Sequence, residues 1–333
     1  MMKQSPFLKD DDDHADVDVL PSQLVMSTIQ AGLSRKVSPW YLQSWVSLSL
    51  TLDGRDKITK FLQYLSRLLA YLYQRRLQQY RFRGTPTKNG ISTSLETAAD
   101  AWKSLYLQLS FSRKAFRLGR SMVEVDKLNQ LGLATAIRQW WKSSNVMDNS
   151  LSTKLSSAIK ILGLAGFWAG DNLNFLTSIG FLDGIIYTTR NEKSQDDRTR
   201  QQIRQIRQQQ WAIRSNQSYF IGSLAGLWMN FLNLYRYRRD YIHPAYQLWL
   251  EAKSLDEKRI AKEQIRLVHE RLFCACLDLL KSCCDVLVFS NNPGMNFWEK
   301  YSGRKLHEVI HCIGGMISSA VVMFHQYPNR PKS

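Results

Sequence analysis

The amino-acid sequence predicts an all-α protein in which amphipathic helices are followed by apolar helices, one or two of them membrane-spanning. Residues 53–80 place large apolar side chains at helical spacing, with polar side chains on the opposite face. The second half of the chain holds uncharged runs that approach the roughly 20 residues a helix needs to cross a bilayer. No stretch of useful length alternates polar and apolar residues as a strand would.

The composition divides the chain into three predicted regions. Residues 1–38 form an acidic N-terminal extension, with an Asp10–Asp13 run and then Ser, Pro and Gly, and this composition predicts disorder. Residues 39–150 form an N-terminal amphipathic helical region. Residues 151–330 form a membrane-associated helical region. It includes an Arg/Gln-rich loop at 190–214, for which a short surface helix is the alternative.

The first long helix is expected to begin at Asp53, a suitable N-cap, and to end at about Tyr80. Its apolar face consists of Ile58, Phe61, Leu62, Leu65, Leu68, Leu69 and Leu72. Such a face fits two situations equally well, packing against partner helices and contact with a membrane.

A second amphipathic helix, expected over 102–125, combines a basic arc with an apolar sector. At helical spacing its four basic residues gather within about a third of the circumference. A helix of this kind can lie in the headgroup layer of an anionic bilayer. The predicted lipid-binding residues are Arg113, Lys114, Arg117, Arg120, Leu107, Phe111, Phe116, Leu118 and Met122. The alternative is a core helix with a solvated basic edge.

Three apolar runs follow, at 161–182, 215–235 and 309–327. The expected membrane spans are 216–235 and 309–327, because these runs lack Asp, Glu, Lys and Arg. All three contain polar residues and glycines, so buried helices of a soluble bundle are the alternative. Ser254 to Glu257 form a capping box that predicts a further helix to about Phe289, with a polar stripe along one side.

A net charge of +17 requires an anionic partner such as lipid headgroups, nucleic acid or an acidic protein. Nothing in the sequence resembles a nucleic-acid-binding motif. We therefore expect anionic membrane lipids as the partner, and no nucleic acid.

One motif typical of an enzyme is present. His307-Glu308-Val309-Ile310-His311 matches His-Glu-x-x-His, in which two histidines on one helix face hold zinc and the glutamate is the general base. Leu182-Asp183-Gly184 is similar to a second motif of membrane metalloproteases. In that class the Leu-Asp-Gly motif follows the histidine motif, whereas here it precedes it. No nearby carboxylate follows that could serve as a third ligand. We therefore predict no metal, no cofactor and no enzymatic activity.

Four short motifs occur in order between residues 50 and 327. They are Asp53-Gly54-Arg55-Asp56-Lys57, Leu109-Ser110-x-Ser112-Arg113-Lys114-x-Phe116-Arg117-x-Gly119-Arg120, Asp171-Asn172-Leu173-Asn174-Phe175-Leu176 and Gly314-Gly315-Met316-Ile317-Ser318-Ser319. In this order they resemble segments of the peroxisomal biogenesis factor 11 family, whose members elongate and divide peroxisomes.

The resemblance implies a protein of the peroxisomal membrane, or of a related organelle such as the glycosome. Such a protein would remodel the membrane by amphipathic-helix insertion and promote peroxisome proliferation and fission. The implied partners are anionic lipids, further copies of the chain, and a dynamin-related fission GTPase with its adaptors. The alternatives are a peroxisomal channel for small metabolites, a membrane zinc protease using His307-Glu308-x-x-His311, and a soluble helical adaptor.

Overall fold

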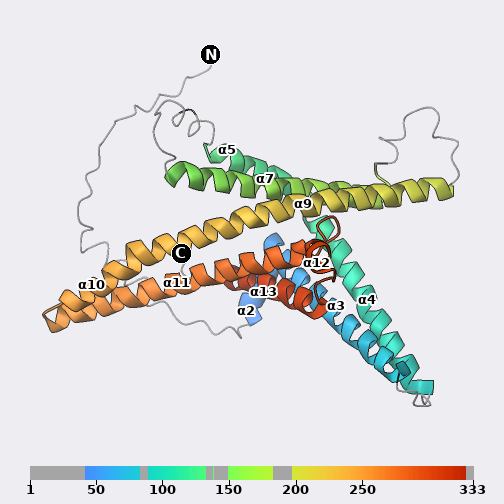
Figure 1. Cartoon of the computed structure of the whole chain (residues 1–333), viewed down its shortest axis with the longest axis horizontal. Helices are drawn as coiled ribbons and strands as arrows, with labels where there is room; N and C mark the ends of the chain where they lie inside the picture. The colour runs from blue at the N-terminus through green and yellow to red at the C-terminus, as the bar shows by residue number, and fades with distance from the viewer. Residues whose placement is uncertain (1–41, 83–88, 133–137, 139–148, 183–196, 328–333) are drawn as a thin grey trace. The chain divides into compact units, whose positions relative to one another are not determined.

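The computed structural model describes residues 42–82, 89–132, 138, 149–182 and 197–327, whose regular secondary structure is entirely helical (Figure 1). In chain order the elements are α2 (Leu42–Leu50), α3 (Leu52–Phe82), α4 (Asn89–Phe116), α5 (Arg120–Gln130), α7 (Asn149–Ser178), α9 (Asp197–Tyr237), the π-helix η1 (Arg238–Ile242), α10 (His243–Glu251), α11 (Leu255–Ser290), α12 (Phe297–Ser302) and α13 (Glu308–Gln326). The predicted all-α fold is confirmed for this part of the chain. The predicted disorder of residues 1–38 lies outside the described residues, and the three-region division stays a prediction.

The turn between α2 and α3 is built by the first of the four motifs. Thr51, rather than the predicted Asp53, caps α3, because the backbone N–H of Gly54 donates to its Oγ1 at 3.0 Å. A Cβ on Gly54 would lie 1.9 Å from the carbonyl oxygen of Leu48, so only glycine fits here. Arg55 donates to two backbone carbonyls at the end of α2, at 2.9 and 3.3 Å. These contacts seat α2 on the start of α3.

The basic helix expected over 102–125 is two helices. α4 ends at Phe116 and α5 begins at Arg120. Between them Gly119 has a φ of 77°, in the left-handed region that commonly ends a helix and that glycine adopts without strain. This break changes the direction of the chain. α4 lies beside α3, whereas α5 packs on α7 (Figure 1).

Helices α7 and α9 lie side by side through a row of small residues (Figure 1). A Cβ on Gly163 of α7 would lie 2.5 Å from the Cα of Gly222 in α9. Nearby, the Ser215 hydroxyl donates to the backbone carbonyl of Phe167 at 2.9 Å. Small residues let helix backbones approach closely, a packing mode common between membrane helices.

Of the two expectations for 190–214, a loop is wrong for residues 197–214, which are helical. The helix is not a short one, because these residues form the first part of the 41-residue α9. Arg and Gln are good helix formers, and no Pro or Gly interrupts the run before Gly222. The expected span 216–235 is therefore the second part of a longer, partly charged helix. Among the described residues, α13 alone is long and apolar enough to cross a membrane, and it coincides with the expected span 309–327.

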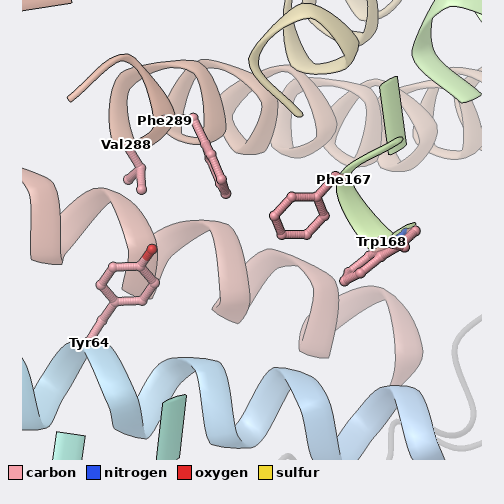
Figure 2. Packing of buried hydrophobic residues seen from close by; sticks show 5 residues of the cluster. All are labelled: Tyr64, Phe167, Trp168, Val288 and Phe289. Atoms are coloured by element: carbon pink, nitrogen blue, oxygen red, sulfur yellow. The ribbon is translucent and has the colours of Figure 1, made fainter. Parts of the chain in front are cut away.

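The apolar core joins three helices that are distant in the sequence. Figure 2 shows Tyr64 of α3, Phe167 and Trp168 of α7, and Val288 and Phe289 of α11. The rings of Phe167 and Phe289 meet edge to face, with centroids 5.8 Å apart. This core holds α3, α7 and α11 together and positions the ion pairs described next.

Candidate membrane-contact site

The two central arginines of the predicted lipid-binding arc point into the protein. Arg113 and Arg117 both donate to Oδ1 of Asp56 in α3, at 3.1 and 2.9 Å. Arg117 also donates to Asp171 of α7 at 2.9 Å, and Arg113 donates to Gln63. Arg117 is only 5% exposed. In this arrangement the pair ties α4 to α3 and α7 and does not face a headgroup layer.

The two outer cations of the arc are also partnered, but they retain partial exposure. Lys114 donates to the side-chain oxygen of Asn174 at 3.1 Å. Arg120 pairs with Asp53 at 2.5 Å and lies over the Trp168 ring, 4.9 Å from its centroid. These two residues are therefore the members of the arc closest to solvent.

Three motifs that are separate in the sequence meet in this cluster. The first supplies Asp53 and Asp56, the second supplies the basic residues, and the third supplies Asp171 and Asn174. Sequence reasoning found the basic residues but missed their carboxylate partners. The signal was present, because Asp56 and Asp171 are acids within otherwise apolar or basic helices.

Asp56 is the hub of the cluster. Burial by itself would raise its pKa, but the charges of Arg117 and Lys57 and their hydrogen bonds outweigh burial and lower the pKa from 3.8 to about 2. The carboxylate is therefore ionised at neutral pH and holds both arginines.

The apolar members of the predicted site lie on the opposite side from the ion pairs. Leu107, Phe111, Leu118 and Met122, called here the apolar row, are all exposed, Met122 by 76%. Phe116 is half-buried. The ring of Phe111 also contacts Phe175, with centroids 5.2 Å apart. Of the nine predicted residues, the structure thus buries two of the four basic ones, leaves the other two partly exposed, and exposes four of the five apolar ones.

A second buried ion cluster lies on the polar stripe of α11. The capping box that begins this helix is confirmed, with the Glu257 N–H donating to the Ser254 hydroxyl at 3.1 Å. Asp285 pairs with Lys60 of α3 at 3.4 Å and with Lys281 at 2.9 Å. It also accepts a 2.6 Å bond from Ser318 of α13. At Asp285, which is buried, the polar stripe therefore packs against other helices.

The His-Glu-x-x-His motif is used for helix packing. Arg67 of α3 forms an ion pair with Glu308, and its Nη1 lies 3.0 Å from Nε2 of His311. His307 meets Tyr71 at 3.3 Å. Arg67 thus engages Glu308 and His311, and Tyr71 engages His307. Within the described ranges, no three His, Cys, Asp or Glu side chains converge as metal ligands.

Together, these features define a class of protein. In both clusters the charges are paired between helices, while many large apolar side chains are exposed. Helical membrane proteins have this arrangement, because ionisable groups face the bundle interior and apolar side chains face lipid. The described part of the chain thus has the features of an all-helical membrane protein, with one candidate crossing helix.

Comparison with known proteins agrees with this class. Residues 42–191 match the model of the family described as peroxisomal biogenesis factor 11 (PEX11). The chain is also 25% identical over 140 residues to a peroxisomal membrane protein 11 homolog of Dictyostelium discoideum, an alignment covering 42% of this chain and 43% of that protein. No solved structure matches.

Over residues 42–191, from α2 past the end of α7, the chain is therefore similar to the peroxisomal biogenesis factor 11 family. The predicted resemblance is confirmed over that region, and the expected location at the peroxisomal membrane is borne out by both matches. The alignment spans less than half of the Dictyostelium protein. Helices α9, α11 and α13 lie beyond the matched region.

Proposed function

We propose that this protein elongates and remodels the peroxisomal membrane by inserting the apolar row of α4 and α5 into the cytosolic leaflet. One-sided insertion expands one leaflet relative to the other, which favours curvature and tubule growth. Proliferation and fission of peroxisomes would follow from that elongation. The coarser role in peroxisome biogenesis rests on the family match.

The exposed apolar row is the observation that carries the proposal. An apolar helix face that lies at a bilayer surface can sink into the boundary between headgroups and acyl chains. Behind the row, Arg113 and Arg117 fasten α4 to α3 and α7 through buried ion pairs. The inserted face is thus mounted on a fixed base, so insertion displaces lipid and does not merely bend the helix.

The basic arc takes two different roles in this proposal. Arg113 and Arg117 form buried ion pairs with carboxylates of α3 and α7. Lys114 and Arg120 keep partial solvent access and can attract anionic headgroups, an effect worth about 1 kcal/mol for each basic residue near the surface.

Two protein partners belong to the same proposal. The family resemblance implies self-association and recruitment of a dynamin-related GTPase with its adaptors. The remodelling step itself needs only lipid, so it can be tested with purified protein and vesicles.

The test is tubulation of vesicles containing anionic lipids, observed by electron microscopy. Replacing both Leu118 and Met122 by Ser should abolish tubules, because the row loses its apolar surface, while the fold remains since both side chains are exposed. The control is the double variant Leu250→Ser with Leu255→Ser. These two leucines lie outside the apolar row and are 72% and 87% exposed, so the control also removes exposed apolar surface. Equal tubulation by both double variants would contradict the proposal.

A measurement in cells complements the vesicle tubulation test. The tagged chain, imaged beside a peroxisomal matrix marker, should lie on elongated peroxisomes. The Leu118 and Met122 double variant should reach the same membrane without elongating it. Peroxisomes that elongate normally with the variant would argue against the apolar row.

A further inference from the structure

A polar cavity of about 280 Å³ lies where α7, α9 and α11 meet. Its side-chain lining includes Lys160, Tyr219, Ser223, Asn230, Asp278 and Lys281. Pockets for drug-sized ligands usually span roughly 300–1,000 Å³, so this one fits a small ion or a single functional group. The proposed remodelling mechanism makes no use of it.

Of the two acidic groups at the cavity, Asp285 already has charged partners. Asp285 is engaged by Lys60, Lys281 and Ser318 in the second ion cluster. Asp278 lies 3.2 Å from Nε2 of His325. The Asn230 amide donates to the hydroxyl of Ser282 and to a backbone carbonyl, at 2.8 and 3.1 Å.

Lys160 is the exception. No hydrogen bond or ion pair joins its ammonium group to another residue in the described part of the chain. Burial, followed by the nearby charge of Lys281, lowers the pKa of Lys160 below its ordinary value. Its stem runs along Gly226 of α9, where an added Cβ would lie 3.6 Å from the lysine side chain. A partly buried cation thus faces a polar space that the protein leaves open.

We propose that this cavity binds a phosphate group, with Lys160 as the principal cation and Lys281 as the second. Asp278 and Glu124 attract Lys160 without forming an ion pair with it, so a bound anion would supply a direct counter-charge. The Ser223 hydroxyl can donate a hydrogen bond to that anion. The Asp278 carboxylate in the wall disfavours highly charged polyanions. Inorganic phosphate and the headgroup of an anionic phospholipid share the required chemistry.

The test measures thermal unfolding of the full chain in detergent, with inorganic phosphate in one arm and mixed micelles containing phosphatidic acid in the other. Lys160→Met keeps the aliphatic stem and removes the charge, and should weaken the stabilising ligand at least tenfold. Lys154→Met is the matched control, since Lys154 is exposed on the same helix and outside the lining. Because the assay has no bilayer to bend, its result is independent of the remodelling proposal.

Each outcome decides the proposal. Stabilisation by inorganic phosphate that Lys160→Met loses identifies a free anion site, and stabilisation by phosphatidic acid alone with the same loss identifies a headgroup site. No stabilisation in either arm, or equal stabilisation of both lysine variants, would overturn the inference. If Lys160→Met does not fold, Gly226→Leu fills the cavity and keeps the lysine. Ligand stabilisation that survives Gly226→Leu would then overturn it.

Discussion

At the scale of single residues, Asp56 shows how one carboxylate organises several helices. It accepts from Arg113 and Arg117 and also pairs with the adjacent Lys57, at 3.1 Å. Without this acid, buried Arg113 would lose its carboxylate partner and Arg117 would keep only Asp171. Removing one partner of a buried ion pair costs about 3–5 kcal/mol. The Gly-Arg-Asp-Lys signature therefore serves the fold, through Gly54 and Arg55 at the α2–α3 turn and Asp56 at the ion cluster.

The ionisation of Asp56 predicts a loss of stability in acid. Its pKa is lower in the folded protein, about 2, than the ordinary 3.8. A lowered folded-state pKa contributes stability that is present above pH 3.8 and is lost as the pH falls toward 2. The full contribution is about 2 kcal/mol at roughly 1.4 kcal/mol per pKa unit. Denaturant unfolding of the detergent-solubilised protein at pH 6 and pH 3 should show about half of this contribution lost.

The matched variant for this experiment is Asp56→Asn, which cannot ionise. It should be less stable than the natural chain at pH 6, and its stability should depend less on pH between 6 and 3. Asp126→Asn, at an exposed aspartate of α5, should change neither. A pH dependence in Asp56→Asn equal to that of the natural chain would refute the assignment.

At the scale of elements, the sequence predicted where helices occur better than where one helix ends and the next begins. The capping box placed the start of α11 correctly, because such a box is a local interaction between residues three apart. The break between α4 and α5 was missed, since Gly119 sits inside a pattern that continues with helical periodicity on both sides. The polarity of the Arg/Gln-rich segment fits a loop or a short surface helix, and it does not reveal that the segment continues into the apolar run as one helix.

The packing of α7 on α9 gives the prediction at this scale. Gly163→Ala should destabilise the protein by about 1–3 kcal/mol, because the new methyl group would overlap the α9 backbone at Gly222. Gly226→Ala makes the same change on α9 where the methyl group meets only the Lys160 stem. It should be neutral or stabilising by up to about 1 kcal/mol, since Ala favours helix over Gly. Denaturant unfolding of both variants measures the difference, and equal effects would contradict close packing at Gly163.

At the scale of the whole molecule, the two ion clusters are buried between helices, while many large apolar side chains are exposed. Lys60, Asp285 and Ser318 join α3, α11 and α13 in one cluster, and the motif at 314–319 contributes its serine there. Gly315 of the same motif lies against Tyr64, where an added Cβ would fall 2.4 Å from the ring. The last family-like motif is thus a contact surface for α3 as well as part of an apolar helix.

The candidate crossing helix predicts a topology. If α13 crosses the peroxisomal membrane, an epitope inserted at the exposed Gly303 and one added after Ser333 will lie on opposite sides. Protease added to intact peroxisomes should digest one tag and spare the other. A matrix enzyme and a cytosol-facing marker report membrane integrity. Tags that share the same fate would show that α13 does not cross.

The sequence by itself determined the helical class, the family-like motifs, the candidate span at 309–327 and the separation of basic from apolar residues on the helix around 102–125. These features depend on spacing along one helix, and helical periodicity fixes which residues share a face. Only the tertiary structure decided what each face contacts. Asp56 and Asp171 come from positions 57 and 54 residues away from their arginines, so no local pattern reveals that the basic face turns inward and the apolar row outward.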